Sequence, residues 1–281
     1  MTTYVVTGAS TGIGEACAAR LAGRGATVFA GVRREEDGER LKARVGSHLR
    51  PLLLDVTDAA QVHAARDTVA ARLGDEPLDG LVNNAGVAVG GPVEYLPVDA
   101  WRDQFEVNVF GVVETTKTFI ELLRRGPGRN VIVGSVSGRL ASPLLGPYAA
   151  SKHAVEALAE SLRHELWDWG VSTSVVEPGA VATPIWEKGR AQASRLEAEL
   201  PAIAVERYRR FIDVVRRAIE QQEKAGVDPD KVAQVIERAL VSPRPRARYL
   251  VGLDAHVQAA LARFMPDRVR DAAQRAFLDR L

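Results

Sequence analysis

The residues TYVVTGASTGIG, from Thr3 to Gly14, place a short β-branched strand directly before a glycine-rich turn, and the alanine-rich run EACAARLAGRG follows. This order predicts a strand, a turn and a helix. Gly8 and Gly12, together with Gly14, allow the backbone to approach a pyrophosphate, which free N–H groups at the start of a helix can bind. A glycine loop alone is a weak signal, and the spacing G-x-x-x-G-x-G differs from the G-x-G-x-x-G of many dinucleotide-binding folds. The stretch predicts the first unit of an α/β fold with a phosphate-binding turn.

Strand-like and helix-like segments continue to alternate along the chain. Further strands are expected at 27–31, 51–54, 78–82, 131–133, 171–177 and 249–253. With 281 residues and 46% hydrophobic content, the chain can bury one substantial core, and the continuing α/β units favour one domain over two. We therefore predict a single doubly wound Rossmann-type domain over residues 1–281, with about seven parallel strands and helices on both faces of the sheet.

Composition and charge narrow the class of function. The 37 basic residues against 36 acidic ones give a net charge of +1, which provides no argument for nucleic acid or an anionic membrane as a partner. The start MTTYVV lacks a basic region, and no run reaches the ~18 apolar residues that span a bilayer, so we expect a cytoplasmic protein. The single Cys17 is interpreted as a small core residue, and the five histidines show no metal-binding spacing, so no metal is expected.

A second stretch, NVIVGSVSGRLASPLLGPYAASK from Asn130 to Lys152, brings three reactive side chains to the end of a strand and the start of a helix. Ser135 follows a β-branched run, and Tyr148 opens a helix after a segment rich in glycine and proline. Because Lys152 lies four residues after Tyr148, both side chains share one helix face. A cation within ~4–6 Å lowers the pKa of a tyrosine, normally about 10, by roughly 1–3 units, which makes the phenol a usable acid and base. The alternative is a common Y-x-x-x-K pair that only packs on the helix surface.

Together these motifs resemble the short-chain dehydrogenase/reductase family, whose members combine TGxxxGIG with Y-x-x-x-K and a serine thirteen residues before the tyrosine. The resemblance covers roughly residues 3–183 and implies a catalytic set formed by Asn108, Ser135, Tyr148 and Lys152. Within that set Asn108 would hold a water of the proton relay, although an asparagine in an apolar stretch can also be a helix-kink residue. The tail, particularly RYLVGLDA, bears a weaker resemblance to the hydroxysteroid and retinol dehydrogenase branch, although we expect no membrane anchor of the kind found in that branch.

The same resemblance implies a dinucleotide cofactor along the carboxyl edge of the sheet. Its binding residues would be Gly8, Ser10, Thr11, Gly12, Ile13, Gly14, Arg33, Asp55, Val56, Asn83, Ala85, Gly86, Tyr148, Lys152, Pro178, Gly179, Val181 and Thr183. Asp55 and Val56 would flank the adenine, and the backbone near Val181 would bind the carboxamide. The NNAG segment 83–86 would stabilise the sheet as well as contact the cofactor, and its alternative reading is a plain Asn/Gly turn.

Cofactor choice is commonly decided just beyond the second strand, where NAD enzymes carry a carboxylate. Counting along GATVFAGVRR, that position is Val32, and the next residue is Arg33. No carboxylate is present there to repel a 2′-phosphate, and a guanidinium is present to bind one. We therefore favour NADP(H), with NAD(H) as the alternative if Arg33 and Arg34 are merely a solvated loop.

The segment 184–226 is expected to be an insertion at the substrate cleft. It is highly charged and is interrupted by Pro201. Residues at helical spacing then follow, namely Tyr208, Phe211, Ile212, Val215 and Ile219. Such a helix either lies over the substrate cleft or packs on the core without ligand contact. Asp228 and Pro229 predict the start of another helix, and residues 254–281 form a predicted helical extension divided at Pro266.

These observations predict an NADP(H)-dependent oxidoreductase that interconverts an alcohol and its ketone or aldehyde by hydride transfer. The substrate would be lipophilic, resembling a hydroxysteroid, a retinoid or another bulky carbonyl compound. The alternatives are an NAD(H)-dependent member of the same family and a non-catalytic dinucleotide-binding sensor, while an epimerase or dehydratase of the extended branch fits the glycine spacing less well. The family resemblance further implies a homodimer or homotetramer, paired through helices near Trp101–Arg125 and Ala149–Trp169, with neither nucleic acid nor membrane as a partner.

Overall fold

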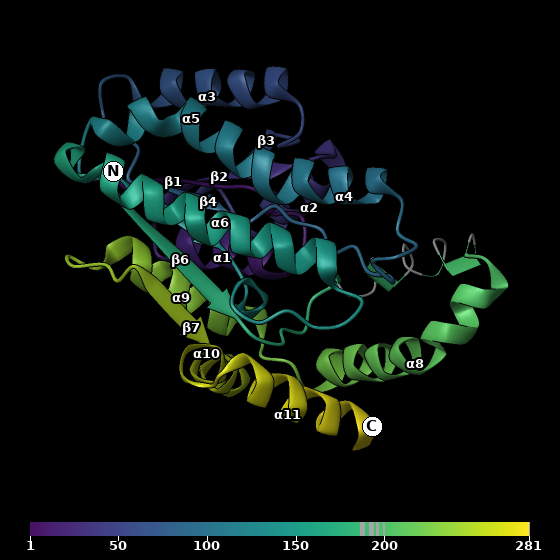
Figure 1. Ribbon diagram of the computed structural model, residues 1–281. Helices are drawn as coiled ribbons and strands as arrows, with labels where there is room; N and C mark the ends of the chain where they lie inside the picture. The colour runs from purple at the N-terminus through teal and green to yellow at the C-terminus, as the bar shows by residue number, and fades with distance from the viewer. Residues whose placement is uncertain (186–188, 191–193, 195–196, 199, 281) are drawn as a thin grey trace.

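The computed structural model describes residues 1–185, 189–190, 194, 197–198 and 200–280 (Figure 1). Within these residues a seven-stranded parallel sheet has the order β3-β2-β1-β4-β5-β6-β7. The winding direction reverses between β1 and β4, which confirms the predicted doubly wound, Rossmann-type fold. The strands are β1 Thr3–Val6, β2 Thr27–Val32, β3 Leu49–Leu53, β4 Gly80–Asn83, β5 Arg129–Val133, β6 Ser172–Pro178 and β7 Arg248–Val251.

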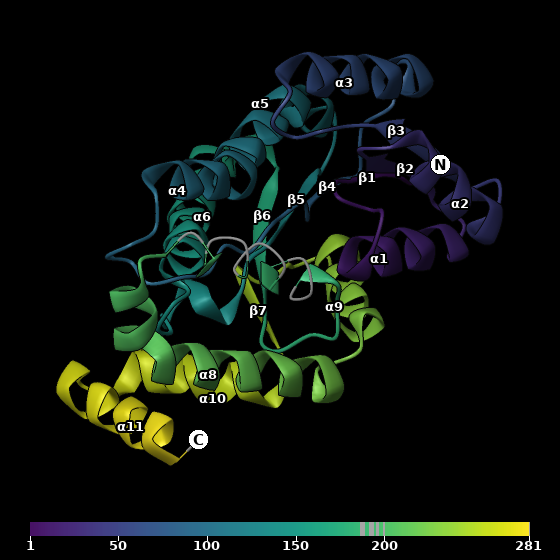
Figure 2. The same cartoon turned by 90° about the vertical axis from the view of Figure 1, so that its right-hand side faces the viewer.

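Helices cover both faces of the sheet (Figures 1 and 2). One face carries α1 Gly12–Gly23, α2 Glu35–Val45 and α9 Pro229–Val241, and the other carries α3 Ala59–Leu73, α5 Gly111–Arg124 and α6 Gly146–Glu165. Successive side chains of a strand point to opposite faces, so in β1 Val6 packs with residues of α1 and α9, whereas Val5 packs with residues of α3 and α5. Burial on both faces explains the uninterrupted β-branched run at the N-terminus.

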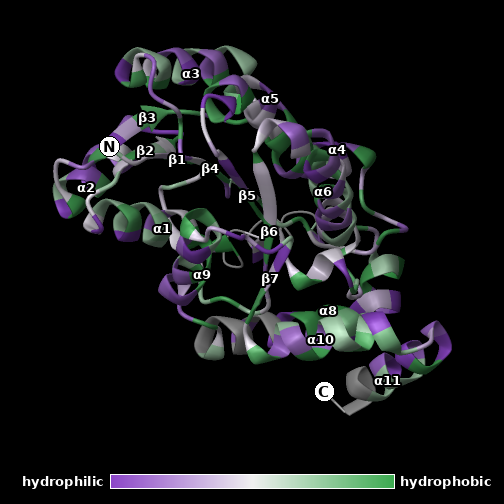
Figure 3. Ribbon diagram, turned by 90° about the vertical axis from the view of Figure 1, so that its left-hand side faces the viewer, coloured by the Kyte–Doolittle hydropathy of each residue, from purple (hydrophilic) through white to green (hydrophobic). Residues whose placement is uncertain are grey.

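Three further helices, α8 Ala202–Ala225, α10 Leu253–Phe264 and α11 Asp267–Arg280, lie beyond the carboxyl ends of β6 and β7 (Figure 1). Hydrophobic and hydrophilic residues are mixed along α11 (Figure 3), and none of its described side chains is buried. The predicted division at Pro266 is present, and Asp228 caps α9 as predicted by accepting a hydrogen bond from the Asp230 N–H. In the described part of the chain, no helix is both long enough and apolar enough to cross a membrane.

Several predicted elements differ from the structure. The last strand ends at Val251 instead of 253, because Gly252 turns the chain with a φ of 101° and Leu253 begins α10. The long helix predicted around Asn108 is divided into α4 Val98–Phe105, the π-helical turn η1 Glu106–Phe110 and α5. Single π turns are frequent at functional sites. Short 3₁₀ turns, η2 Val136–Gly138 and η3 Trp167–Trp169, follow β5 and α6.

The structure tests two further predictions only in part, namely the insertion at the substrate cleft and the pairing of two copies of the chain. The predicted insertion 184–226 falls partly outside the described residues, and so does the side chain of Ile219, but α8 begins directly after Pro201 as expected. Next to the helices that were predicted to pair two copies of the chain, Phe110 and Trp167 are exposed. Their exposure is compatible with pairing, and the homodimer or homotetramer stays a prediction.

Asn83, at the end of β4, ties this strand to its neighbour and to α5. It is 2% exposed, and its Nδ2 donates to Asn130 Oδ1 at 3.0 Å and to Thr116 Oγ1 at 3.1 Å. Because Asn83→Ala leaves both buried oxygens without this donor, we expect the free energy of unfolding measured in urea to fall by about 2–4 kcal/mol. The control is Gln234→Ala, which removes an exposed amide bonded to Asp230 and should change that free energy by less than about 0.5 kcal/mol. Equal losses in the two variants would contradict this role.

Candidate active site

The candidate site is built where the loops after β1 and β4 meet. These two strands are neighbours at the point where the winding of the sheet reverses. The Thr7 hydroxyl accepts hydrogen bonds from the N–H groups of Asn84 at 3.0 Å and Ala85 at 3.1 Å. The Asn84 side-chain amide donates in return to the carbonyls of Thr7 at 3.0 Å and Gly8 at 3.1 Å. These four bonds hold the two loops together along one edge of the sheet.

A cleft along this edge brings together most of the predicted site. The predicted residues that line it are Gly8, Ser10, Thr11, Gly12, Ile13, Arg33, Asp55, Val56, Ala85, Gly86, Ser135, Tyr148, Lys152, Pro178, Gly179, Val181 and Thr183. The predicted residues that do not line it are Gly14, Asn83 and Asn108. Residues that line it without having been predicted include Asn84, Val87, Ala88, Val107, Gly134, Pro184, Ile185 and Gly189.

The glycine turn has the geometry of a phosphate cradle. Gly8 and Gly12 adopt φ values of 63° and 61°, which side chains disfavour. A Cβ on Gly8 would lie 2.7 Å from the Cα of Ala85, so the backbone itself forms the wall of the turn. Thr11, the N-cap of α1, makes no side-chain capping bond within the described chain, which leaves the first N–H groups of the helix for another acceptor. These features fit the pyrophosphate of a dinucleotide.

Ser135, Tyr148 and Lys152 meet at the carboxyl end of β5. Ser135 lies just beyond the strand, and α6 carries the other two residues. The Ser135 hydroxyl is hydrogen-bonded to the Tyr148 phenol, and the Lys152 Nζ lies 5.7 Å from the centroid of the Tyr148 ring. Lys152 Nζ also donates to the Val133 carbonyl at 2.8 Å. The predicted meeting of a hydroxyl, a phenol and an amine is therefore present.

Burial, and not Lys152, dominates the acidity of Tyr148. Removal from water raises the pKa of Tyr148, and the hydrogen bond with Ser135 offsets only part of this change. Burial also lowers the pKa of Lys152 to about 8, against the opposing charge of Glu156. The prediction that Lys152 lowers the pKa of Tyr148 is wrong for this structure, because desolvation disfavours the charged form of both groups. The phenol is therefore protonated at neutral pH.

Asn108 supports the cleft without lining it. Its Oδ1 accepts from the Val87 N–H at 2.9 Å, and its Nδ2 donates to the Val87 carbonyl at 3.0 Å and to Ser151 Oγ at 3.1 Å. Val87 does line the cleft, so Asn108 fixes the position of one wall from within η1. Its predicted role in holding a water stays a prediction.

The two asparagines of the NNAG segment have different positions. Asn83 faces Asn130 and Thr116 inside the sheet, so its predicted contact with the cofactor does not fit the structure, whereas its predicted role in stabilising the sheet does. Asn84 lines the cleft and bonds the glycine turn instead. Successive side chains of an extended segment point to opposite sides, and this alternation was the available signal for separating the two.

Three arginines and one carboxylate lie near the end of β2. Arg34 Nε and Arg40 Nη1 bond Asp37 at 3.1 Å and 2.7 Å, and although burial opposes ionisation of Asp37, these bonds outweigh it and lower the pKa of Asp37. Arg40 Nη2 also donates to the Ser10 carbonyl at 3.2 Å, which places at the glycine turn a second cation that the sequence did not predict. Arg33 is exposed, lines the cleft and makes no hydrogen bond or ion pair with another described residue. Its guanidinium is available to a ligand.

Outside the cleft, the described chain adds no further reactive centre of the kinds considered from the sequence. Cys17 is fully buried on α1, and burial raises the pKa of its thiol to about 12. It therefore packs as a small core residue. Among the residues that the structure describes, no group of three or more His, Cys, Asp or Glu side chains is arranged to hold a metal ion.

Comparison with known proteins identifies the family. The family model described as short chain dehydrogenase matches residues 2–194, which is more than half of the chain. The chain belongs to the short-chain dehydrogenase family. Two relatives match this short-chain dehydrogenase over 272 residues and 95% of its length. The NADPH-dependent 3-dehydrocapnine reductase of Ornithobacterium rhinotracheale is 34% identical, with 94% of its own length covered. The 17-beta-hydroxysteroid dehydrogenase type 6 of Bos taurus is 35% identical, with 85% covered.

Solved structures agree with this assignment. The crystal structure of a short-chain dehydrogenase from Streptomyces avermitilis matches with a TM-score of 0.77 at 30% identity, covering 99% of this chain and 95% of that one. Because the matches to hydroxysteroid and retinol dehydrogenases cover 95% of the chain, they extend into its tail. The predicted family, its oxidoreductase class and the resemblance to this branch are thus confirmed.

Gly14 provides a test of the cradle in this short-chain dehydrogenase. A Cβ at Gly14 would lie 2.3 Å from the Gly8 carbonyl oxygen and 2.4 Å from Asn84 Nδ2, so Gly14→Ala must displace the turn. We expect NADPH affinity, measured by fluorescence titration, to fall at least about tenfold, equivalent to ~1.4 kcal/mol. Gly23→Ala is the matched control at the other end of α1, because its Cβ would meet nothing within 4 Å. Unchanged affinity in Gly14→Ala would rule out the glycine turn as the phosphate site.

Proposed function

We propose that this short-chain dehydrogenase is an NADP(H)-dependent oxidoreductase that interconverts a lipophilic alcohol and its ketone or aldehyde by hydride transfer. The observation that carries the proposal is that Ser135, Tyr148 and Lys152 line the same cleft as the glycine turn. A dinucleotide-binding sensor needs the turn but not a buried acid beside it, so this arrangement argues against the non-catalytic alternative. The reductase from Ornithobacterium rhinotracheale, which is named NADPH-dependent, supports the cofactor and the reaction class.

In the proposed reaction, Tyr148, Ser135 and Lys152 each have a separate role. NADP(H), when bound, supplies or accepts the hydride. In reduction, the Tyr148 phenol donates a proton to the substrate oxygen, and the Ser135 hydroxyl holds that oxygen by a hydrogen bond. The Lys152 ammonium would bind the nicotinamide ribose, and in oxidation the phenolate form of Tyr148 would accept the proton of the alcohol. Burial raises the pKa of Tyr148, so at neutral pH the phenol carries the proton that reduction of a carbonyl requires.

A second, mostly apolar cavity supports a lipophilic substrate. It shares Ala88 and Gly189 with the cofactor cleft, so the two cavities adjoin. The Gly91 N–H donates to the Leu144 carbonyl at 2.7 Å and joins two of the loops that form its wall. Other apolar lining residues are Pro92, Leu96, Leu145, Leu200, Ile212 and Val215. Since α8 supplies two of these residues, the wall also favours the predicted role of segment 184–226 at the substrate cleft.

Tyr148→Phe tests the assigned acid. Removing the proton donor should lower kcat by about 10²–10⁴-fold while NADPH binding stays within about twofold of wild type. The assay follows NADPH absorbance with androstanedione, retinal and undecanone, and with glucose as a polar comparison. Tyr249→Phe is the control, because this hydroxyl bonds the Arg246 N–H and does not line the cleft. A near-wild-type kcat in Tyr148→Phe, or turnover of glucose alone, would contradict the proposal.

Arg33 tests the cofactor preference. Its guanidinium can give a 2′-phosphate a charge-assisted bond, so Arg33→Ala should weaken NADPH binding by about tenfold to a hundredfold and leave NADH binding nearly unchanged. Adding Val32→Asp should turn the preference toward NADH, because a carboxylate repels the phosphate and accepts bonds from ribose hydroxyls. Arg34→Ala is the matched control, since Arg34 is bonded to Asp37. Tighter binding of NADH than NADPH by the wild-type protein would overturn the assignment.

A further inference from the structure

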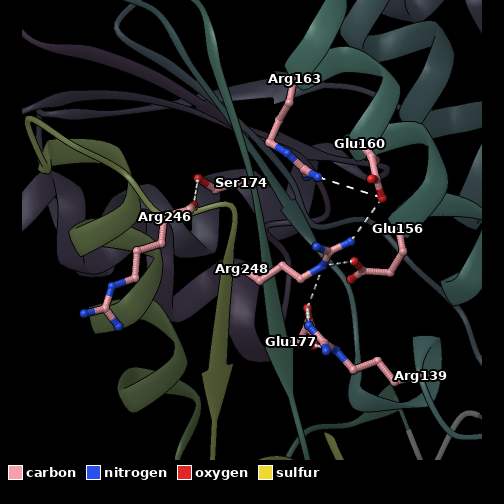
Figure 4. Close-up of polar contacts among 8 residues, drawn as sticks. All are labelled: Arg139, Glu156, Glu160, Arg163, Ser174, Glu177, Arg246 and Arg248. Atoms are coloured by element: carbon pink, nitrogen blue, oxygen red, sulfur yellow. Dashed lines mark hydrogen bonds and ion pairs between the residues drawn. The ribbon is translucent and has the colours of Figure 1, made fainter. Parts of the chain in front are cut away.

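A group of buried charges lies behind the reactive turn of α6 (Figure 4). Glu156 lies four residues after Lys152, so the two side chains share one face of the helix. Glu177, on the neighbouring strand β6, is fully buried, and Glu156 is only 9% exposed. Charged groups at this depth need partners, because an unpaired buried charge is costly.

Two arginines supply most of that pairing. Arg139 donates to both carboxylate oxygens of Glu177, with Nη2 at 2.8 Å from Oε1. Arg248, on β7, places its Nε 2.8 Å from Glu156 Oε2 and 3.6 Å from Glu177 Oε1. Its Nη2 lies 3.5 Å from the more exposed Glu160 (Figure 4). Two cations therefore balance two buried carboxylates, with Arg248 between them.

Glu156 is the less completely paired of the two buried carboxylates, and it borders the catalytic segment. Its Oε1 is buried and has no hydrogen-bond partner in the described part of the chain. A Cβ on Gly134, the residue before Ser135, would lie 3.4 Å from this oxygen, and one on Gly138 would lie 3.3 Å from Glu156 Cγ. The carboxylate thus fills the space directly behind the residues that form the reactive end of β5.

Lys152 needs a countercharge in this environment. Among the residues that the structure describes, its Nζ donates to the neutral carbonyl of Val133. Burial lowers the pKa of Lys152 to about 8, and Glu156 is the charged group that opposes this shift. Burial and then the nearby Glu177 raise the pKa of Glu156, while Arg248 lowers it. On balance the pKa of Glu156 is raised, and Arg248 limits this rise by favouring the ionised form.

We propose that Glu156 is a positioning residue of the reaction, whose carboxylate, held by Arg248, keeps the Lys152 amine protonated for binding the cofactor ribose. This inference rests on the proposed function. It assigns the buried charges a purpose beyond packing, since the neutral hydrogen bond of Lys152 alone does not compensate an ammonium. The charged groups that face Glu156 are Lys152 and Glu160 from α6, Glu177 from β6, Arg139 from the segment after η2, and Arg248 from β7.

The test is the pH dependence of NADPH affinity, measured by nicotinamide fluorescence from about pH 6 to pH 10. Affinity for NADPH should fall as the pH rises and Lys152 loses its proton, because the neutral amine is a weaker partner for the ribose. Removing the Glu156 charge disfavours the ammonium, so Glu156→Gln should move the midpoint of this fall about one pH unit lower. A purely structural role would instead weaken binding at every pH. An unmoved midpoint in Glu156→Gln would overturn the proposal.

Glu160→Gln is the matched control. It removes one negative charge from the same helix and from the same arginine, but the Glu160 side chain is 57% exposed and its charge is screened by water. The proposal expects a midpoint within about 0.2 pH units of wild type in this variant. An equal shift in both variants would show a general effect of helix charge and would also overturn the role of Glu156.

A second variant is available if the first one does not fold. If Glu156→Gln does not purify as folded protein, Glu156→Met removes the same charge with a side chain of similar length, and the same shift is expected. Binding is read without turnover, so failure here is distinguishable from failure of the proposed function. The latter would appear as absent carbonyl reduction by the wild-type protein, whatever its binding profile.

Discussion

The hydrogen bonds from the Asn84 amide to the carbonyls of Thr7 and Gly8 join the loops after two neighbouring strands, and the rest of the site depends on them. They bring the glycine turn against the NNAG segment so closely that Gly14 has no space for a Cβ. The start of α1 is thereby fixed relative to β4. Asn108 attaches the next wall by bonding Val87 from within η1. The glycine turn and the carboxyl end of β5, far apart in the sequence, therefore border one cleft.

The buried charged side chains around this cleft lower the stability of the fold, because each of them is removed from water. Glu177 has no exposed surface, and its pairing with Arg139 offsets a large desolvation penalty instead of adding net stability. Lys152 is buried and donates to a neutral carbonyl. Its burial lowers its pKa to about 8. Packing alone would be served better by apolar side chains at these positions. Buried acids and bases of this kind are typical of sites that tune proton transfer.

The sequence was sufficient for features that depend on local order. The run from Thr3 to Gly14 predicted its strand, turn and helix, and the spacing of Tyr148 and Lys152 placed both on one face of α6. It was insufficient where tertiary packing decides. Alternation places Asn83 and Asn84 on opposite sides of the segment but does not say which of them faces the cleft, and the acidity of Tyr148 depends on burial that no local pattern reports.

The contact between the buried charges Glu156 and Arg248 could not be predicted from the sequence either. Glu156 and Arg248 are separated by 92 positions, and they meet only because β7 pairs with β6 next to α6. Nothing in either local segment distinguishes them from surface charges. The end of β7 was likewise misplaced, because the left-handed turn at Gly252 ends the strand while the apolar pattern continues into Leu253.

The function proposed for this cleft is the transfer of a hydride between a nicotinamide and a carbonyl carbon. Its most direct test uses NADPH deuterated at the transferring position of the nicotinamide ring, with whichever panel ketone or aldehyde the protein reduces fastest. We expect one deuterium on the carbinol carbon of the alcohol product, and none at that carbon when unlabelled NADPH is used in heavy water. A carbinol carbon without deuterium from the labelled cofactor, or with deuterium from the solvent, would contradict it.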